Sequence, residues 1–184
     1  MATFILLAVD SYARPGQMMR LHSDMIFRPS ETNQYWTLSL DPETRGIPSK
    51  TGEYDTTIAL DAKHYESLTP ILERLAELPS DRPLWSFTYP ELVGRFYTAC
   101  AKVGVQLVVY QARHSGASID ATLRRRSLAD IQKRGGWRST KSTNRYEKGG
   151  RLAQVWTGLS HSQRAHCLRR EENLTTALVH GRAV

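Results

Sequence analysis

The chain has 184 residues, and its 25 lysines and arginines exceed its 18 aspartates and glutamates, which gives a formal net charge of +7. With 40% hydrophobic and 23% charged residues it can bury one core, so a disordered or collagen-like chain is excluded and a single folded intracellular domain is expected. The two cysteines, Cys100 and Cys167, have neither CxxC spacing nor histidines at ligand spacing, so we expect neither a disulfide framework nor a zinc site.

The chain begins with an apolar segment, residues 2–9, that Asp10 interrupts. This segment is too short to span a membrane and lacks the basic flank of a signal peptide, so it predicts a buried helix. The helical pattern extends over residues 3–20 with a break at Pro15-Gly16, where the proline can also begin a new helical turn.

Short β-rich segments separated by turn residues follow, and they predict a small antiparallel sheet with strands at residues 24–28, 34–40 and 56–60. Apolar residues at spacings of three and four then predict an amphipathic helix over residues 62–78. Another helix is expected over residues 90–103, with Gly104 as its C-cap.

Helices are expected to dominate the second half of the chain. One is predicted over residues 115–126. Ser127, with Asp130 three places later, has the pattern of a capping box that opens a short helix, and Gly135-Gly136 closes it.

Two more helices are predicted after these glycines. The first starts at Ser139 or Thr140 and ends at Gly149-Gly150. The last has an apolar stripe that either belongs to the core or docks on another subunit, formed by Leu152, Val155, Trp156 and Leu159. The whole pattern indicates an α+β, mainly α fold with a small three-stranded antiparallel sheet.

The positive charge is concentrated in one part of the chain. Residues 101–151 contain twelve lysines and arginines against three acidic residues, while the remainder is close to neutral. Such a concentration is typical of a protein that binds a polyanion such as nucleic acid. A solvated helix face is the alternative interpretation, so charge alone suggests a partner without identifying it.

Three short motifs occur in order within this basic segment: Tyr110-Gln-Ala-Arg113-His114, Gly136-Trp137 and Thr143-Asn-Arg-Tyr146. Together they resemble the catalytic domain of the tyrosine recombinases, the phage-integrase family, in which a His-x-x-Arg-His box precedes a Gly-His or Gly-Trp pair and then a tyrosine. Trp137 follows Arg113 by 24 positions and Tyr146 follows Trp137 by nine, in agreement with the family's layout.

Two upstream segments extend the resemblance over most of the chain. Arg14 and the residues up to Leu21 resemble the family's first box, a helix-borne arginine with an acidic residue three places later. Ser49-Lys50-Thr-Gly52 resembles the turn between strands two and three that carries the family's lysine. Any one box is a weak signal, whereas the ordered set of five is a strong one.

The resemblance implies a catalytic role for six residues: Arg14, Lys50, Tyr110, Arg113, Trp137 and Tyr146. The two arginines would clamp the phosphate, since guanidinium is always charged and matches phosphate oxygens with a planar fork. The phenol of Tyr146 would be the nucleophile and Lys50 the general acid for the departing 5′ oxygen. Trp137 would donate its indole N–H to the phosphate.

Two departures from the family pattern lead us to expect reduced or conditional activity. Gln17 stands where the family usually has the carboxylate that orients the first arginine. Tyr110 replaces the usual histidine, and a phenol with a reference pKa near 10 is a poorer proton shuttle, although it can still donate a hydrogen bond.

Further basic residues are candidates for DNA contact, and His114 could instead support Arg113. The candidates are His114, Arg124, Arg125, Arg126, Lys133, Arg134, Arg138, Lys141 and Arg145. Each site residue also has an ordinary interpretation: Arg124–Arg126 as a solvated helix face, Trp137 as a core anchor, Tyr110 as a strand-end aromatic.

The predicted function is site-specific cleavage and rejoining of double-stranded DNA through a 3′-phosphotyrosine, without metal or cofactor, by a homotetramer inside the cell in nucleus or nucleoid. We expect residues 1–160 to form the catalytic domain and residues 161–184 a helical tail exchanged between subunits, with the family's N-terminal DNA-clamping domain absent. Two alternatives remain: a type IB topoisomerase, and a non-catalytic DNA-binding remnant of a mobile-element integrase.

Overall fold

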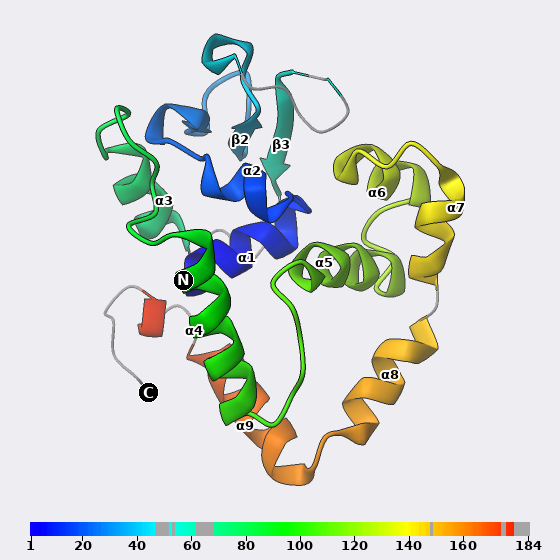
Figure 1. Ribbon diagram of the computed structural model, residues 1–184. Coiled ribbons are helices and arrows are strands. Elements are labelled where there is room, and N and C mark those ends of the chain that lie inside the picture. The colour runs from blue at the N-terminus through cyan, green and yellow to red at the C-terminus, as the bar shows by residue number, and fades with distance from the viewer. Residues whose placement is uncertain (47–51, 53, 62–67, 148, 174–175, 179–184) are drawn as a thin grey trace.

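The computed structural model describes residues 1–184 apart from 47–51, 53, 62–67, 148, 174–175 and 179–184 (Figure 1). Two helices open the chain, α1 (Ala2–Ser11) and α2 (Pro15–Met19). Phe4, Leu7 and Ala8 are buried, which confirms the predicted buried helix. Helix α1 ends at Ser11, before the predicted break at Pro15-Gly16. Pro15 begins α2, because its fixed φ and missing N–H suit the first turn of a helix.

The β-strands form one antiparallel sheet in the order β1 (Ile26–Phe27), β2 (Trp36–Leu40) and β3 (Thr56–Leu60). Leu38 in the central strand lies opposite Ile26 on one side and Ile58 on the other, and all three side chains are buried. This confirms the predicted sheet. The first strand is shorter than predicted because residues Ser23–Met25 form a 3-10 turn, η1; another, η2 (Glu43–Arg45), follows β2.

Helices α3 (Thr69–Ala76) and α4 (Tyr89–Lys102) lie on the side of α1 away from α5 and α6 (Figure 1). Phe4 meets the ring of Trp85, in the segment before α4, edge-on at 5.3 Å. Thr88 caps α4, and Gly104 follows its end with a φ of 71°, which glycine adopts readily. The first residues of the predicted 62–78 helix lie outside the described residues.

Helix α5 (Gln111–Thr122) crosses α1 at close range. The contact depends on Gly116, because a Cβ there would overlap the carbonyl oxygen of Val9. The prediction of residues 115–126 was wrong at both ends: the helix starts earlier, and Arg124 turns to a φ of 51° because the chain must bend toward α6 (Leu128–Gly135). The capping box of Ser127 with Asp130 is confirmed.

The remaining elements are α7 (Thr140–Thr143), the 3-10 turn η4 (Asn144–Glu147), α8 (Gly149–Gly158) and α9 (His161–Glu172). The prediction that Gly149-Gly150 ends a helix was wrong: the chain has already left the α-helix at Asn144, and the glycines begin α8. Val155 and Trp156 are 59% and 41% exposed, so these two residues are not core within this chain. Helix α9 returns beside α4 (Figure 1), where Gln163 Nε2 donates to the Val103 carbonyl at 3.0 Å.

Across the described ranges, no helix has both the length and the apolar character needed to cross a bilayer.

Candidate active site

Trp137 lies at the centre of the predicted site, in the segment that follows α6. The guanidinium of Arg113 sits 4.4 Å from the centre of its ring. The rings of Tyr146 and His114 lie 5.2 Å and 6.3 Å away, and the ring of Tyr12 lies 6.1 Å away. The indole therefore contacts side chains from α5, from η4 and from the loop between α1 and α2, so all three motifs of the basic segment come together.

Arg113 is held inside this cluster by two backbone carbonyls. Its Nη1 donates to the carbonyl oxygen of Tyr12 and its Nη2 to that of Gly135. The side chain is buried, and its Nε has no hydrogen-bond partner among the described residues. Burial and the nearby charge of Arg14 lower the pKa of Arg113 to about 10, so it stays charged at neutral pH. Donor capacity remains for an anionic ligand.

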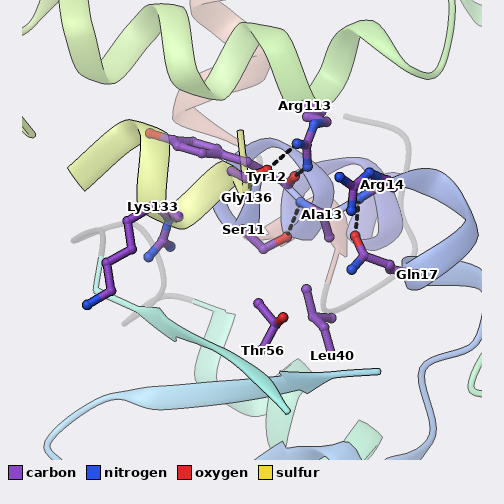
Figure 2. A pocket seen from close by; sticks show the side chains of 12 residues that line it. Ser11, Tyr12, Ala13, Arg14, Gln17, Leu40, Thr56, Arg113, Lys133 and Gly136 are labelled. Atoms are coloured by element: carbon purple, nitrogen blue, oxygen red, sulfur yellow. Dashed lines mark hydrogen bonds between the residues drawn. The ribbon is translucent and has the colours of Figure 1, made fainter. Parts of the chain in front are cut away.

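Arg14 is the N-cap residue of α2 and lies near Arg113. Figure 2 shows the Arg14 and Arg113 side chains approaching each other above the loop that carries Ser11–Ala13. Both line a cavity of about 60 Å³, which Lys133 and Thr56 also border. Two neighbouring guanidinium groups repel each other, so an anion placed between them would be favoured.

Tyr146 and His114 form a hydrogen bond between the phenol oxygen and Nδ1 of the imidazole. Tyr146 is 4% exposed and belongs to a buried cluster with Tyr12, Ala117 and Ile131. When the proton of the imidazole sits on Nε2, Nδ1 accepts the phenol proton, as a general base would. The pair could not be inferred from sequence, because 32 positions separate the two residues.

Tyr110 stands at the N-terminus of α5 and is 42% exposed. Its ring contacts the His114 ring edge-on at 5.1 Å, and its phenol is near enough to Arg113 to oppose the fall of the arginine's pKa. The structure thus brings Tyr110 to the cluster that holds Arg113, Trp137 and Tyr146. Lys50 lies outside the described residues.

Two of the arginines predicted to contact DNA have carboxylate partners within the chain. Arg134 Nη2 lies 2.9 Å from Asp10 Oδ2, and the Arg134 side chain is 8% exposed. Arg126 pairs with both Asp61 and Asp120. The charges of these two arginines are therefore paired within the chain. Their contact with DNA stays a prediction.

Most of the other basic candidates are exposed to solvent. Arg124, Arg125, Lys133, Arg138 and Lys141 are at least partly exposed, and Arg145 belongs to η4. His114 is partly buried beside Tyr146. DNA contact by these residues stays a prediction, and the exposure of Arg124, Arg125, Lys133, Arg138 and Lys141 is compatible with it.

Two residues near the site were not singled out from sequence. Tyr12 adopts a φ of 52°, unusual for a residue other than glycine, and its phenol donates to Asp120 Oδ2 at 2.5 Å. Asp41, directly after β2, accepts a hydrogen bond from the amide of Gln17. No local sequence signal marks either one, since both bonds join distant segments. Within the described part of the chain, no group of histidine, cysteine and acidic residues could hold a metal ion.

Comparisons with known proteins give no match to a protein-family model or to a curated protein sequence. Several solved structures, in contrast, are similar to this chain in fold. The post-cleavage complex of XerH site-specific recombinase with palindromic difH substrate has a TM-score of 0.59 at 20% identity, over 83% of this chain and 43% of that chain. The XerH pre-cleavage complex with difH gives 0.57 at 19% identity, over 83% and 44%. The catalytic domain of bacteriophage HP1 integrase gives 0.52 at 16% identity, over 78% and 71%.

This chain has a tyrosine recombinase catalytic-domain fold. The similarity confirms the fold implied by the sequence motifs and agrees with the mainly helical architecture and its small sheet. The chain spans less than half the length of the XerH recombinase that it matches. At 16–20% identity the likeness extends to the fold alone.

Proposed function

We propose that the chain cleaves and rejoins DNA strands through a covalent 3′-phosphotyrosine, as a site-specific recombinase or integrase. The observation that carries the proposal is the grouping of Tyr146, His114 and Arg113 around the ring of Trp137. A nucleophile, a base and a fixed cation within one aromatic cluster are what metal-free attack on a phosphodiester requires.

The two arginines supply the electrostatic part of this function. In-line attack concentrates negative charge on the nonbridging phosphate oxygens. Arg113 is fixed by two carbonyls, so it needs little reorganisation to meet that charge. Arg14 lines the same cavity next to Arg113 (Figure 2).

In the proposed step, the phenol oxygen of Tyr146 attacks phosphorus while Nδ1 of His114 takes its proton. The bond between phosphorus and the 5′ oxygen breaks, and that oxygen receives a proton from a general acid, the role that the sequence resemblance assigns to Lys50. Rejoining reverses these transfers: the 5′ hydroxyl attacks the phosphotyrosine and the phenol leaves.

The burial of Tyr146 adds one requirement to this scheme. With only 4% of the residue exposed, its oxygen must move toward the phosphate before attack, and η4 is a single short 3-10 turn. We therefore propose that DNA binding shifts η4 so that the phenol oxygen reaches the phosphate while its hydrogen bond to Nδ1 of His114, on α5, is kept.

The proposal includes double-stranded DNA as substrate, with the exposed basic residues as phosphate contacts, and a DNA-associated location in the cell. It also includes a tetramer on DNA, in which the exposed Val155 and Trp156 of α8 dock on a second copy. Burying this apolar pair at an interface would recover the free energy that its exposure to water costs in the single chain.

Nicked suicide DNA tests the proposal, because loss of the cleaved end traps the covalent adduct. We expect wild type to form an adduct that denaturing gels resolve, and Tyr146→Phe to form none while binding DNA equally well. Binding without adduct in both proteins would favour the non-catalytic alternative. Relaxation of supercoils without joining of two marked duplexes would favour the topoisomerase alternative.

A further inference from the structure

Asp41 is a buried carboxylate at the end of β2. Its side chain is 1% exposed, and its φ of 52° lies in the left-handed region that Asp and Asn tolerate better than most residues. Its backbone carbonyl accepts a hydrogen bond from the backbone N–H of Asp55 at 3.1 Å, which fixes its place at the edge of the sheet. Since a buried carboxylate is costly unless it is paired, its partners are informative.

Two side chains form hydrogen bonds with this carboxylate, one from within α2 and one from the residue that caps its C-terminus. Arg20 Nη2 lies 2.6 Å from Oδ1, and the amide nitrogen of Gln17 donates to Oδ2. Gln17 itself is 7% exposed, so little water competes with the second bond. The carboxylate therefore links the sheet to the helix that begins directly after Arg14.

The bond to Asp41 fixes which way the Gln17 amide points. A carboxylate only accepts hydrogen bonds, so the NH₂ end of the amide must face Asp41. The oxygen end then faces the start of α2, where Oε1 accepts from the backbone N–H of Arg14 at 2.9 Å. A continuous path of hydrogen bonds thus runs from Asp41 through Gln17 to Arg14.

We propose that Asp41 is a positioning residue for Arg14: through Gln17 it holds the backbone N–H of Arg14, and so the start of the helix from which the Arg14 side chain projects. This rests on the proposed function of Arg14 as a phosphate ligand. Because Gln17 is neutral, it can transmit the orientation only if a fixed acceptor holds its NH₂ end. Asp41 is that acceptor among the described residues.

The proposal predicts an unusual response to substitution at position 17. In this chain, Gln17→Glu places two carboxylates against each other in a buried site, so they repel and the start of α2 shifts. Combining Gln17→Glu with Asp41→Asn restores the pattern, with the negative charge moved from position 41 to position 17. The NH₂ of the new asparagine donates to the new glutamate, the asparagine oxygen accepts from Arg20, and the left-handed φ remains tolerated.

The experiment compares wild type, Gln17→Glu, Asp41→Asn and the double variant. Asp24→Asn is the matched control, since Asp24 also accepts from an arginine, Arg45, at 2.7 and 2.8 Å, but is half-exposed and takes no part in the hydrogen bonds that lead from Asp41 to Arg14. Three quantities are measured for each: the single-turnover rate of adduct formation on nicked DNA, the affinity for an uncleaved duplex of the same sequence, and the Tm. Arg14→Ala shows how far the rate and the affinity fall when the cation is lost completely.

We expect Gln17→Glu to slow adduct formation and weaken duplex binding, each by about tenfold or more and toward the values of Arg14→Ala. The double variant should recover to within about threefold of wild type. Asp24→Asn should change neither quantity. All assays run at least about 15 °C below the lowest Tm, so that the fraction folded does not affect the rates.

Wild-type rates and affinity in Gln17→Glu would overturn the proposal, and so would a double variant no better than Gln17→Glu. A loss of rate that simply follows Tm across all the variants would also overturn it, since that describes a purely structural residue. The affinity measurement keeps the test independent of catalysis. If wild type forms no adduct, the proposed function fails, while the affinities still decide whether Asp41 positions Arg14.

Discussion

Nδ1 of His114 and the phenol oxygen of Tyr146 are hydrogen-bonded at the centre of an aromatic cluster. The two residues come from α5 and from η4, the turn after α7, and Trp137 packs on both rings. In the proposed mechanism this hydrogen bond makes His114 the base for Tyr146, whereas the sequence alone predicted a DNA contact.

His114→Phe separates these two roles. The substitution keeps a ring against Trp137 but removes the acceptor for the phenol proton. Because a positioned general base contributes roughly 10²- to 10⁴-fold, we expect adduct formation to slow by about 10²-fold or more. Duplex affinity, measured by fluorescence anisotropy, should stay within about twofold of wild type, because the exposed lysines and arginines proposed as phosphate contacts are unchanged. Weaker binding with an unchanged single-turnover rate would instead identify His114 as a DNA contact.

Gly116→Ala tests the close crossing of α1 and α5. The added Cβ would overlap the Val9 carbonyl and the Tyr12 ring, so the helices must separate. We expect the free energy of unfolding, measured in urea, to fall by about 1–3 kcal/mol or more. Gly94→Ala is the control: its Cβ meets nothing within 4 Å inside α4, and it should stabilise the protein by up to about 1 kcal/mol.

Asp10 gives the protein a pH-dependent stability. Burial raises the pKa of Asp10 to about 6, against the opposing charge of Arg134. The folded state therefore holds this proton more tightly than the unfolded state, and the contribution to stability is lost as the pH rises through about 6. The advantage of wild type over Asp10→Asn should shrink by roughly 1–3 kcal/mol between about pH 4 and pH 7 in urea unfolding. An advantage that grows with pH would mean that the ion pair with Arg134 outweighs burial.

Tyr12 has a left-handed backbone conformation two positions before Arg14, and Tyr12→Phe tests whether its phenol holds it in place. The phenol donates to Asp120, a buried carboxylate that also pairs with Arg126. Loss of this donor should lower the free energy of unfolding by about 1–3 kcal/mol. Tyr97→Phe, at a tyrosine that is 48% exposed on α4, should change it by less than about 0.5 kcal/mol. Equal effects of the two substitutions would contradict the assignment.

Much of the fold could be predicted because its signals are local. The strand at residues 56–60, the capping box of Ser127 and the helix start at Pro15 each depend on residues within a few positions of one another. The motif order brought Arg113, Trp137 and Tyr146 together correctly, because spacing along the chain carried the information. The end of α5 was mispredicted because the turn at Arg124 depends on packing against α6.

The contacts that hold the site in place could not be predicted in the same way. Arg134 reads as part of a basic run, yet its partner Asp10 lies 124 positions earlier. Asp41 reads as the first residue of a loop, yet it orients Gln17 from 24 positions away. Net charge along a segment does not reveal ion pairs between segments, so the basic run overstates the free positive charge near the site.

The two carbonyls that hold Arg113 are the terminal ones of α1 and α6, whose C-terminal peptide groups lack partners inside their own helices. The guanidinium is therefore a shared C-cap for both helices, stabilised by the negative ends of their dipoles. A single side chain joins the assembly of the domain to the proposed binding of phosphate. Loss of activity in Arg113→Ala would therefore not distinguish a folding defect from loss of phosphate binding. Tyr146→Phe removes one oxygen atom and leaves the Arg113 cap intact.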